Sequence, residues 1–317
     1  MFDPYLDDED GPLSDVALSL LARDPTGERW GKIIRHTFDM IYNGQETGRY
    51  RWEDLMKTER THIGTLFEIN AQREFNFPGY DSDKTDYRIA GHPVDAKWSQ
   101  KDGGWMLPPE VFGELALVGT GSDEQATWSL GLVRVRDEYR RDGSNRDSKS
   151  QLNVTGRSAV RWLWLNEALP PNVLLQLAKE TVDYIMDSKS GAERTNRLFR
   201  AAEGMIVHRN AVATVSRQLD HQKRVRYNGG ARSALRNEGI LILSGTYYAN
   251  LARAFGVPVP GRDEYVSVRV RESENTSAVR INGLRWVRAR PGEPSVKPAP
   301  MLPRTGGHED WAGGDLN

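Results

Sequence analysis

The stretch "DYRIAGHPVDAKWS", residues 86–99, decides the fold of the first half of the chain, because its periodicity is that of strands. Apolar and polar residues alternate over 94–99, as they do in a strand with one buried face. The polar face carries Asp95, Lys97 and Ser99. We predict two strands, 86–90 and 94–99, joined by a turn at 91–93.

The segments on either side of this hairpin predict a mixed sheet flanked by helices. "ELALVGTG" (114–121) and "ATWSLGLVRVRDE" (126–138) have strand patterns, which extends the sheet to four or five strands. Apolar residues at three- and four-residue spacing predict helices over 13–24, 27–44 and 61–75, the second stopping at Asn43-Gly44. The N-terminal half is therefore expected to be an α/β layer structure.

The second half of the chain begins with helical patterns and ends in strands. Three segments with helical spacing, 173–189, 192–207 and 210–219, precede a basic stretch, and residues 265–272 then alternate strictly. "AVRINGLRWVRAR" (278–290) has the Asn282-Gly283 dipeptide of a two-residue hairpin. Compact helices followed by a basic hairpin favour a winged-helix domain that binds nucleic acid.

Charge is divided unevenly along the chain. Residues 1–163 carry 28 Asp and Glu against 21 Lys and Arg, whereas residues 164–317 carry 16 against 22. Between Arg217 and Arg236 there are six basic residues and one acidic residue. Such clusters neutralise phosphates and release counterions, so the second half is expected to bind a polyanion. Uneven placement of solvated surface charge is the alternative.

Composition excludes several kinds of site. The chain has no cysteine, which excludes disulfides, thiolate nucleophiles and cysteine zinc sites, and its six histidines lack the H-E-x-x-H spacing of a zinc protease. No run of eighteen apolar residues and no basic-then-apolar leader occurs, so we expect a soluble, cytoplasmic protein.

The polar face of residues 94–99 suggests metal-dependent phosphodiester chemistry. Asp95 and Lys97 project from the same face of a strand, close enough to share a phosphate. The hairpin brings Asp86 beside Asp95, and Glu68 on the preceding helix is a plausible fourth member. Carboxylates hold Mg²⁺, and a lysine orients the attacking water and stabilises developing negative charge.

Chance is the competing interpretation of these residues. Two more Asp-x-Lys triplets occur, at 147–149 in a polar loop and at 187–189 at the end of a helix, and neither follows an acidic strand. Asp95 and Lys97 could form a surface ion pair of at most about 1 kcal/mol. Asp86 could cap a strand, and Glu68 could be a solvated helix position.

Four stretches together resemble the NaeI-type restriction endonucleases, in the same order and through nearly the whole chain. They are "GQETGRYRWEDLMKTERTHIGTLFEIN", "TDYRIAGHPVDAKWS", "GWMLPPE" and "KRVRYNGGARSALRNEGILIL". The resemblance implies a restriction-endonuclease-like domain of the PD-(D/E)xK class, with an α/β fold, followed by a winged-helix domain. It also implies a Mg²⁺-dependent homodimer that cuts GCCGGC at its centre to blunt ends while a second DNA copy acts as effector.

The resemblance also implies roles for individual residues. The active-site acids and metal ligands fall on Glu68, Asp86 and Asp95, and the catalytic lysine falls on Lys97. The residues expected to contact DNA are basic and lie in the second half: Lys223, Arg224, Arg226, Arg232, Arg236 and Arg285.

We divide the chain on this basis into five parts. They are an acidic tail (1–11), an endonuclease domain (12–163), a linker (164–172), a winged-helix domain (173–290) and a disordered tail (291–317). The rival functions are a DNA-binding regulator without catalysis and a repair nuclease that reads DNA structure.

Overall fold

A computed structural model of the chain describes residues 10–80, 83–143, 148–290, 293 and 297–302. The predicted acidic tail (1–11) and C-terminal tail (291–317) lie largely outside these ranges. The chain divides into two compact units. The first contains residues 1–42 and 51–171, and the second contains residues 43–50 and 172–317.

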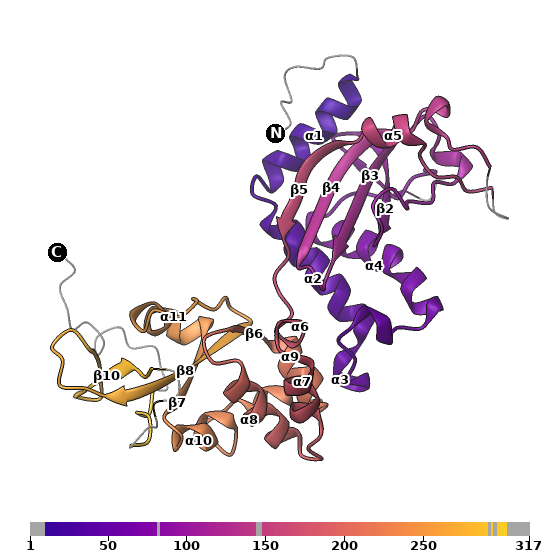
Figure 1. The fold of residues 1–317 in the computed structure, drawn as a ribbon. Helices are drawn as coiled ribbons and strands as arrows, with labels where there is room; N and C mark the ends of the chain where they lie inside the picture. Colours follow the sequence, from indigo (N-terminus) through magenta and orange to yellow (C-terminus); the bar gives the residue numbers. More distant parts are fainter. Residues whose placement is uncertain (1–9, 81–82, 144–147, 291–292, 294–296, 303–317) are drawn as a thin grey trace. The chain divides into compact units, whose positions relative to one another are not determined.

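The first unit is a five-stranded mixed sheet flanked by helices, as its sequence pattern predicts. β1 (Tyr87–Ile89), β2 (His92–Ser99), β3 (Leu115–Ser122), β4 (Thr127–Arg134) and β5 (Arg161–Ala168) lie in that order in the sheet. Only the β2–β3 pair is parallel. Figure 1 shows β2 to β5 side by side. The sequence-based division places residue 163 at a domain end, whereas β5 runs across it.

Helices cover one face of this sheet. They are α1 (Gly11–Arg23), α2 (Glu28–Tyr42) and α4 (Lys57–Phe75). The first unit also contains four short helical segments, η1 (Trp52–Asp54), η2 (Pro109–Val111), η3 (Asp137–Tyr139) and α5 (Val154–Ser158). Trp30, Phe38 and Phe67 of these helices are fully buried in a core shared with Val94 and Ala96 of β2. The alternation of β2 therefore buries its apolar face against α2 and α4, and turns Asp95 and Lys97 to the opposite face.

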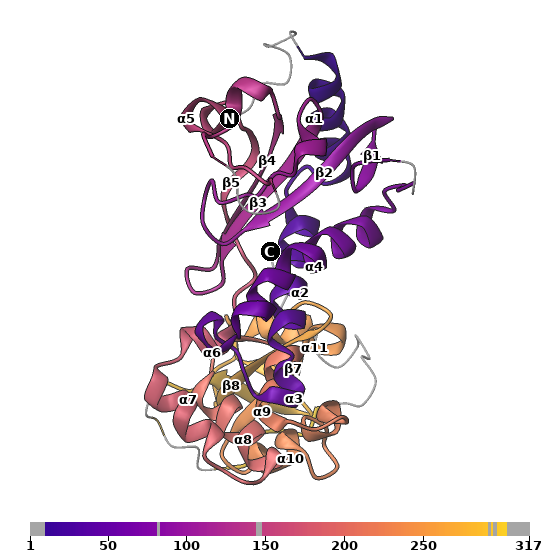
Figure 2. The ribbon, with the colours of Figure 1, turned by 90° about the vertical axis from the view of Figure 1, so that its right-hand side faces the viewer.

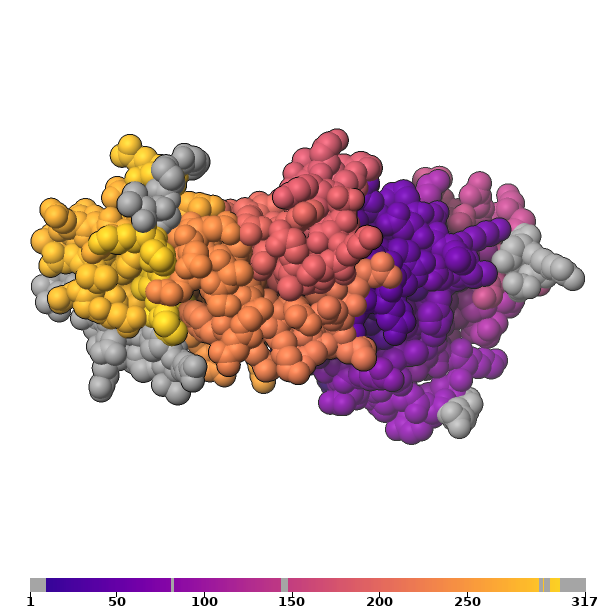
Figure 3. Space-filling model, turned by 90° about the horizontal axis from the view of Figure 1, so that it is seen from below, coloured from indigo at the N-terminus to yellow at the C-terminus, as the bar shows by residue number. Residues whose placement is uncertain are grey.

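The second unit combines helices with a smaller sheet. Its helices are α3 (Gly44–Thr47), α6 (Val173–Gln176), α7 (Lys179–Met186), α8 (Gly191–Ala201), α9 (Arg209–Ser216), η4 (His221–Arg224), α10 (Ala231–Arg236) and α11 (Gly245–Ala254). Figure 3 shows the surface of this unit, with the rose segment of α7 and α8 beside the orange segment that follows it in sequence.

The strands of the second unit are β6 (Ile206–His208), β7 (Ile240–Ser244), β8 (Glu264–Glu272), β9 (Val279–Ile281) and β10 (Leu284–Arg288). The long strand β8 pairs with β6, β7 and β10, and β10 pairs with β9. Ile281 faces Leu284 across the predicted two-residue turn, where Asn282 and Gly283 have φ values of 50° and 80°. Both positive φ values are those of the type I′ hairpin, so this local prediction is confirmed.

No helix among the described residues is long and apolar enough to span a membrane.

Candidate active site

The candidate site begins where the pairing of β1 with β2 ends. Tyr87 to Ile89 pair with Val94 to His92, and Asp86 immediately precedes this ladder. The main-chain N–H of Ala96 donates a hydrogen bond to Asp86 Oδ2 at 2.6 Å. The Asp86 side chain thus takes the place of a strand partner at the edge of β2, and this contact holds its carboxylate next to Asp95 and Lys97.

Asp95 and Lys97 share the polar face of β2. The Asp95 side chain is 4% exposed and is ion-paired with Lys97 Nζ, which also lies 3.9 Å from Asp86 Oδ2. In the parallel register Asp95 lies opposite Ala116 and Lys97 opposite Val118, both fully buried apolar residues of β3. Apolar neighbours lower the local dielectric constant, so the charges of this cluster interact more strongly than surface charges do.

Glu68 approaches the same cluster from α4. The helix is fixed by Ile63, Phe67 and Asn70, which are buried and follow the stripe predicted from the sequence. The pKa of Glu68 is raised to about 7, mainly by burial and also by the Asp86 carboxylate, while Lys97 lowers it. Asp95 also raises the pKa of Glu68. The helix and the sheet thus bring Glu68 within electrostatic reach of all three residues predicted to act with it.

Asp95 is perturbed in the same direction. The pKa of Asp95 is raised to about 6, mainly by burial, with Lys97 lowering it and Asp86 raising it. Two acids whose charged forms are disfavoured beside a third acid form a set that a bound cation would stabilise. Clusters with such perturbed groups are frequent at functional sites.

The donor chemistry fits a hard divalent cation. No group of three His, Asp or Glu side chains within the described ranges is arranged to hold a metal ion directly. Mg²⁺ does not require a complete protein cage, since it retains several waters and is often bound through one or two carboxylates. Asp86 and Asp95 converge on Lys97 Nζ from two segments. This pair of carboxylates is consistent with Mg²⁺ binding.

A fifth charged residue near the site was not predicted from the sequence. Glu110 of η2 adds to the rise in the pKa of Asp95. It follows Pro108 and Pro109 in a loop, where no periodicity indicates the direction of a side chain. Of the competing triplets, residues 187–189 lie at and beyond the end of α7, and Asp147 of the other triplet lies outside the described residues.

The predicted DNA-binding residues occupy different environments in the second unit. Lys223 of η4 is ion-paired with Asp220, and Arg226, which follows η4, is exposed. Arg232 of α10 donates to the main-chain oxygen of Ile242 at 3.0 Å, and its guanidinium lies over the rings of Tyr227 and Tyr248.

The remaining three predicted DNA contacts also have neighbours in the unit. Arg224 of η4 donates to the Gln218 side chain, and Arg236 of α10 donates to the main-chain oxygen of Ala299 at 2.7 Å. Arg285 of β10 lies opposite Arg280 of β9. Arg285 is half-buried and donates to the main-chain oxygen of Glu274 at 3.4 Å, so Arg226 is the exposed one among the predicted arginines.

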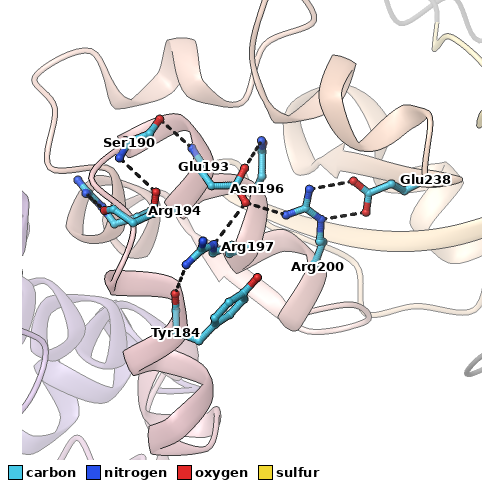
Figure 4. A network of polar contacts seen from close by, with 9 residues as sticks. Tyr184, Ser190, Glu193, Arg194, Asn196, Arg197, Arg200 and Glu238 are labelled. Atoms are coloured by element: carbon cyan, nitrogen blue, oxygen red, sulfur yellow. Dashed lines mark hydrogen bonds and ion pairs between the residues drawn. The ribbon is translucent and has the colours of Figure 1, made fainter.

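The arginines of α8 are engaged within the unit. Figure 4 shows Arg197 and Arg200 beside Glu193. Arg200 also donates from Nε and Nη2 to the two carboxylate oxygens of Glu238, each at 2.9 Å. Arg194 donates to the main-chain oxygens of Ser188 and Ser216. These contacts tie α8 to its neighbours, so the positive charge of α8 is largely compensated inside the unit.

Comparison with known proteins identifies the family of the chain. The family model described as restriction endonuclease NaeI matches residues 14–297. A curated relative, the type II restriction enzyme NaeI of Lentzea aerocolonigenes, is 43% identical over 308 residues, which cover 93% of this chain and 95% of the relative. The match includes both units, and it excludes the regulator without catalysis. The chain therefore belongs to the NaeI family of restriction endonucleases.

Proposed function

We propose that this restriction endonuclease is a Mg²⁺-dependent homodimer that cuts both strands of cytoplasmic duplex DNA at the palindrome GCCGGC. Cleavage at the centre leaves blunt ends with 5′-phosphate and 3′-hydroxyl groups. The observation that carries the proposal is the convergence of Glu68, Asp86, Asp95 and Lys97 in a chain of this family. The sequence GCCGGC follows from the family resemblance.

Asp86 and the triplet Asp95-Ala96-Lys97 are the elements of a PD-(D/E)xK site in this proposal. Asp86 and Asp95 would hold Mg²⁺ directly, and Glu68 would reach it through a retained water. The ion would activate water and offset charge on the scissile phosphate. Lys97 orients the attacking water and stabilises negative charge on the pentavalent phosphate. The hydrogen bond from Ala96 N–H fixes the Asp86 carboxylate before substrate arrives, so little reorganisation accompanies catalysis.

The second unit is proposed to be a winged-helix domain. Its segments α8, β6, α9, α10, β7 and β8 follow the helix–strand–helix–helix–strand–strand order of that fold, and β8 pairs with both β6 and β7. In this assignment α10 and the preceding basic stretch face DNA. Lys223, Arg224 and Arg226 would hold phosphates together with Arg285 on the β9–β10 hairpin, and Arg232 and Arg236 would support α10.

The twofold symmetry of a palindrome supports the dimer. A palindrome has twofold symmetry, and a twofold dimer presents the same site to each strand. In the proposal, the first unit binds the duplex that is cleaved and the second unit binds the effector duplex. The rival repair nuclease would need only one copy of DNA and would show no fixed site.

A plasmid digest tests the proposal. Purified protein and Mg²⁺ should convert a plasmid into discrete fragments whose blunt ends map to the centre of GCCGGC. Discrete fragments with other ends would contradict the site assignment, and smeared or junction-specific cleavage would favour the repair nuclease. A digest in which EDTA replaces Mg²⁺ is the control, and cleavage there would contradict metal dependence.

A further inference from the structure

Residues Asn43–Tyr50, here called the strap, belong to the second unit although the residues on both sides belong to the first. α2 ends at Tyr42, and the chain returns to the first unit at Arg51. The strap is therefore a short excursion from the nuclease half of the chain into the half that carries the basic segment.

Close packing holds the strap on α9. Its helix α3 lies against α9 (Figure 2). A Cβ atom at Gly44 would lie 3.0 Å from Thr214 Cβ and 2.9 Å from the main-chain oxygen of Arg49, and it would be closer still to Thr214 Oγ1. These distances are shorter than ordinary van der Waals contacts, so only glycine allows α3 to approach α9 this closely.

Polar and apolar contacts extend this attachment along the strap. Arg217 Nη2, at the C-terminal cap of α9, donates to the main-chain oxygen of Glu46 at 3.0 Å. Asn172 Nδ2 donates to the main-chain oxygen of Tyr50 at 3.4 Å, and the Tyr50 ring packs against the apolar core of the second unit. The strap is thus fixed to the second unit at its start, its middle and its end.

The residues that flank the strap are fixed in the first unit. Before it, the Tyr42 hydroxyl donates to Asp123 Oδ2 at 2.9 Å. After it, the Trp52 ring meets the Phe38 ring edge-on at 6.3 Å, and Leu55 is buried. α4, which carries Glu68, begins two residues beyond Leu55. The chain is therefore anchored in the first unit on both sides of the strap, and the segment that leaves the strap runs directly into the helix that carries Glu68.

The other end of this connection is the basic segment. α9 ends at Ser216, and Arg217, which contacts the strap, is the first of the six basic residues that extend to Arg236. The residue that holds the strap is therefore also the first residue of the segment that is expected to bind DNA.

We propose that the strap couples DNA occupancy of the second unit to the placement of Glu68, and so regulates cleavage. This inference rests on the proposed function, in which the second unit binds an effector duplex. DNA on the basic segment fixes α9, α9 fixes α3 through the Gly44–Thr214 contact, and α3 fixes the residues that lead into α4. Coupling of this kind is reciprocal, so the nuclease half also influences DNA binding by the second unit.

Gly44→Ala tests the coupling in the full-length protein. The added methyl group separates α3 from α9 without removing a charge. We expect Gly44→Ala to bind a short duplex and to cleave a one-site plasmid at the basal rate. The factor by which added duplex raises its cleavage rate should be at least about fivefold smaller than in the wild type, which is the lower end of typical allosteric coupling. Gly11→Ala is the matched control, because a Cβ there meets nothing within 4 Å, and its stimulation should equal that of the wild type.

A disulfide variant keeps the test decisive if Gly44→Ala fails to fold. The chain has no cysteine, so Gly44→Cys with Thr214→Cys introduces a single possible pair. A small displacement from the 3.0 Å Cβ separation reaches the normal disulfide range of about 3.5–4.5 Å. The oxidised protein should be stimulated by added duplex, and the reduced protein should lose the stimulation.

The outcomes separate this inference from the proposed function. The strap proposal alone would be overturned if added duplex stimulated cleavage by Gly44→Ala as much as cleavage by the wild type. Equal stimulation of cleavage by the oxidised and the reduced cysteine variant would overturn it as well. A wild type that cleaves but gains nothing from added duplex would overturn the effector part of the proposed function, and the role of the strap with it. A wild type without any cleavage would overturn the nuclease itself.

Discussion

Lys97 Nζ forms an ion pair with the buried carboxylate of Asp95, two residues earlier on β2. The pair lies on the face of the strand that turns away from the helix-covered core, and Asp86 lies 3.9 Å from the same ammonium group. Lys97 thus offsets the charge of two carboxylates in the unbound protein. The same position allows it to act on a phosphate when those carboxylates engage a cation.

Glu68 should make the stability of the metal-free protein depend on pH. Its pKa is about 7 in the folded protein, above the ordinary value of 4.5. Between these values the folded state holds a proton that the unfolded state has lost, so a rise in pH lowers the free energy of unfolding. The Tm of the wild type minus that of Glu68→Gln should therefore fall from about pH 4.5 to about pH 7.

Calorimetry with EDTA present measures this difference directly. A Tm difference that stays constant over the same pH range would show that Glu68 is not perturbed. Added Mg²⁺ should then raise the Tm of the wild type more than that of Glu68→Gln above this range, because the carboxylate is charged there.

A buried ion pair in the first unit should contribute strongly to its stability. The Arg35 and Asp123 side chains are 6% and 2% exposed, and Arg35 Nη2 donates to Asp123 Oδ2 at 3.0 Å. Asp123→Ala leaves Arg35 buried with less compensation, which typically costs about 3–5 kcal/mol. Urea unfolding followed by tryptophan fluorescence reports on this unit, since seven of the nine tryptophans lie in residues 1–171.

The exposed pair Arg29–Glu74 provides the matched control for this experiment. Its side chains are 40% and 46% exposed, so Glu74→Ala should change the free energy of unfolding by at most about 1 kcal/mol. Similar losses in Asp123→Ala and Glu74→Ala would contradict the importance assigned to burial.

Arg226 and Arg232 should respond differently to substitution by alanine. Exposed Arg226 is proposed to contact phosphate, so Arg226→Ala should weaken binding to all duplexes alike and reduce the slope of log K against log salt by about one. Arg232 lies over two tyrosine rings and donates to Ile242, so Arg232→Ala should destabilise the fold by about 1–2 kcal/mol.

Fluorescence anisotropy at several salt concentrations and urea unfolding followed by circular dichroism separate these two effects. A changed salt slope with unchanged stability in Arg232→Ala would instead assign that residue to the DNA interface.

The sequence pattern predicted those helices, strands and turns whose formation depends on residues close together in the chain. The alternation over 94–99 identifies the strand that carries Asp95 and Lys97, and Asn282-Gly283 identifies the hairpin turn. The helical stripe through Ile63 and Phe67 likewise identifies α4. Each of these patterns reflects a period of the backbone, so a short window of sequence contains it.

Long-range packing determined what the patterns did not predict. Nothing within residues 43–50 indicates that they belong to the second unit, because the Gly44–Thr214 approach joins segments far apart in the sequence. The aromatic surroundings of Arg232 are hidden in the same way, since Tyr248 follows on another helix. The raised pKa of Glu68 depends on burial and on three charges from β2 and the residue before β1.

Lys97→Ala tests the central claim most directly. Alanine removes the ammonium group from a half-buried position on β2 and leaves Asp86 and Asp95 in place. With Mg²⁺ and one plasmid substrate, the variant should shift DNA on a gel as the wild type does, while its cleavage rate falls by on the order of 10²–10³. Cleavage by Lys97→Ala at the wild-type rate would contradict the site and the mechanism together.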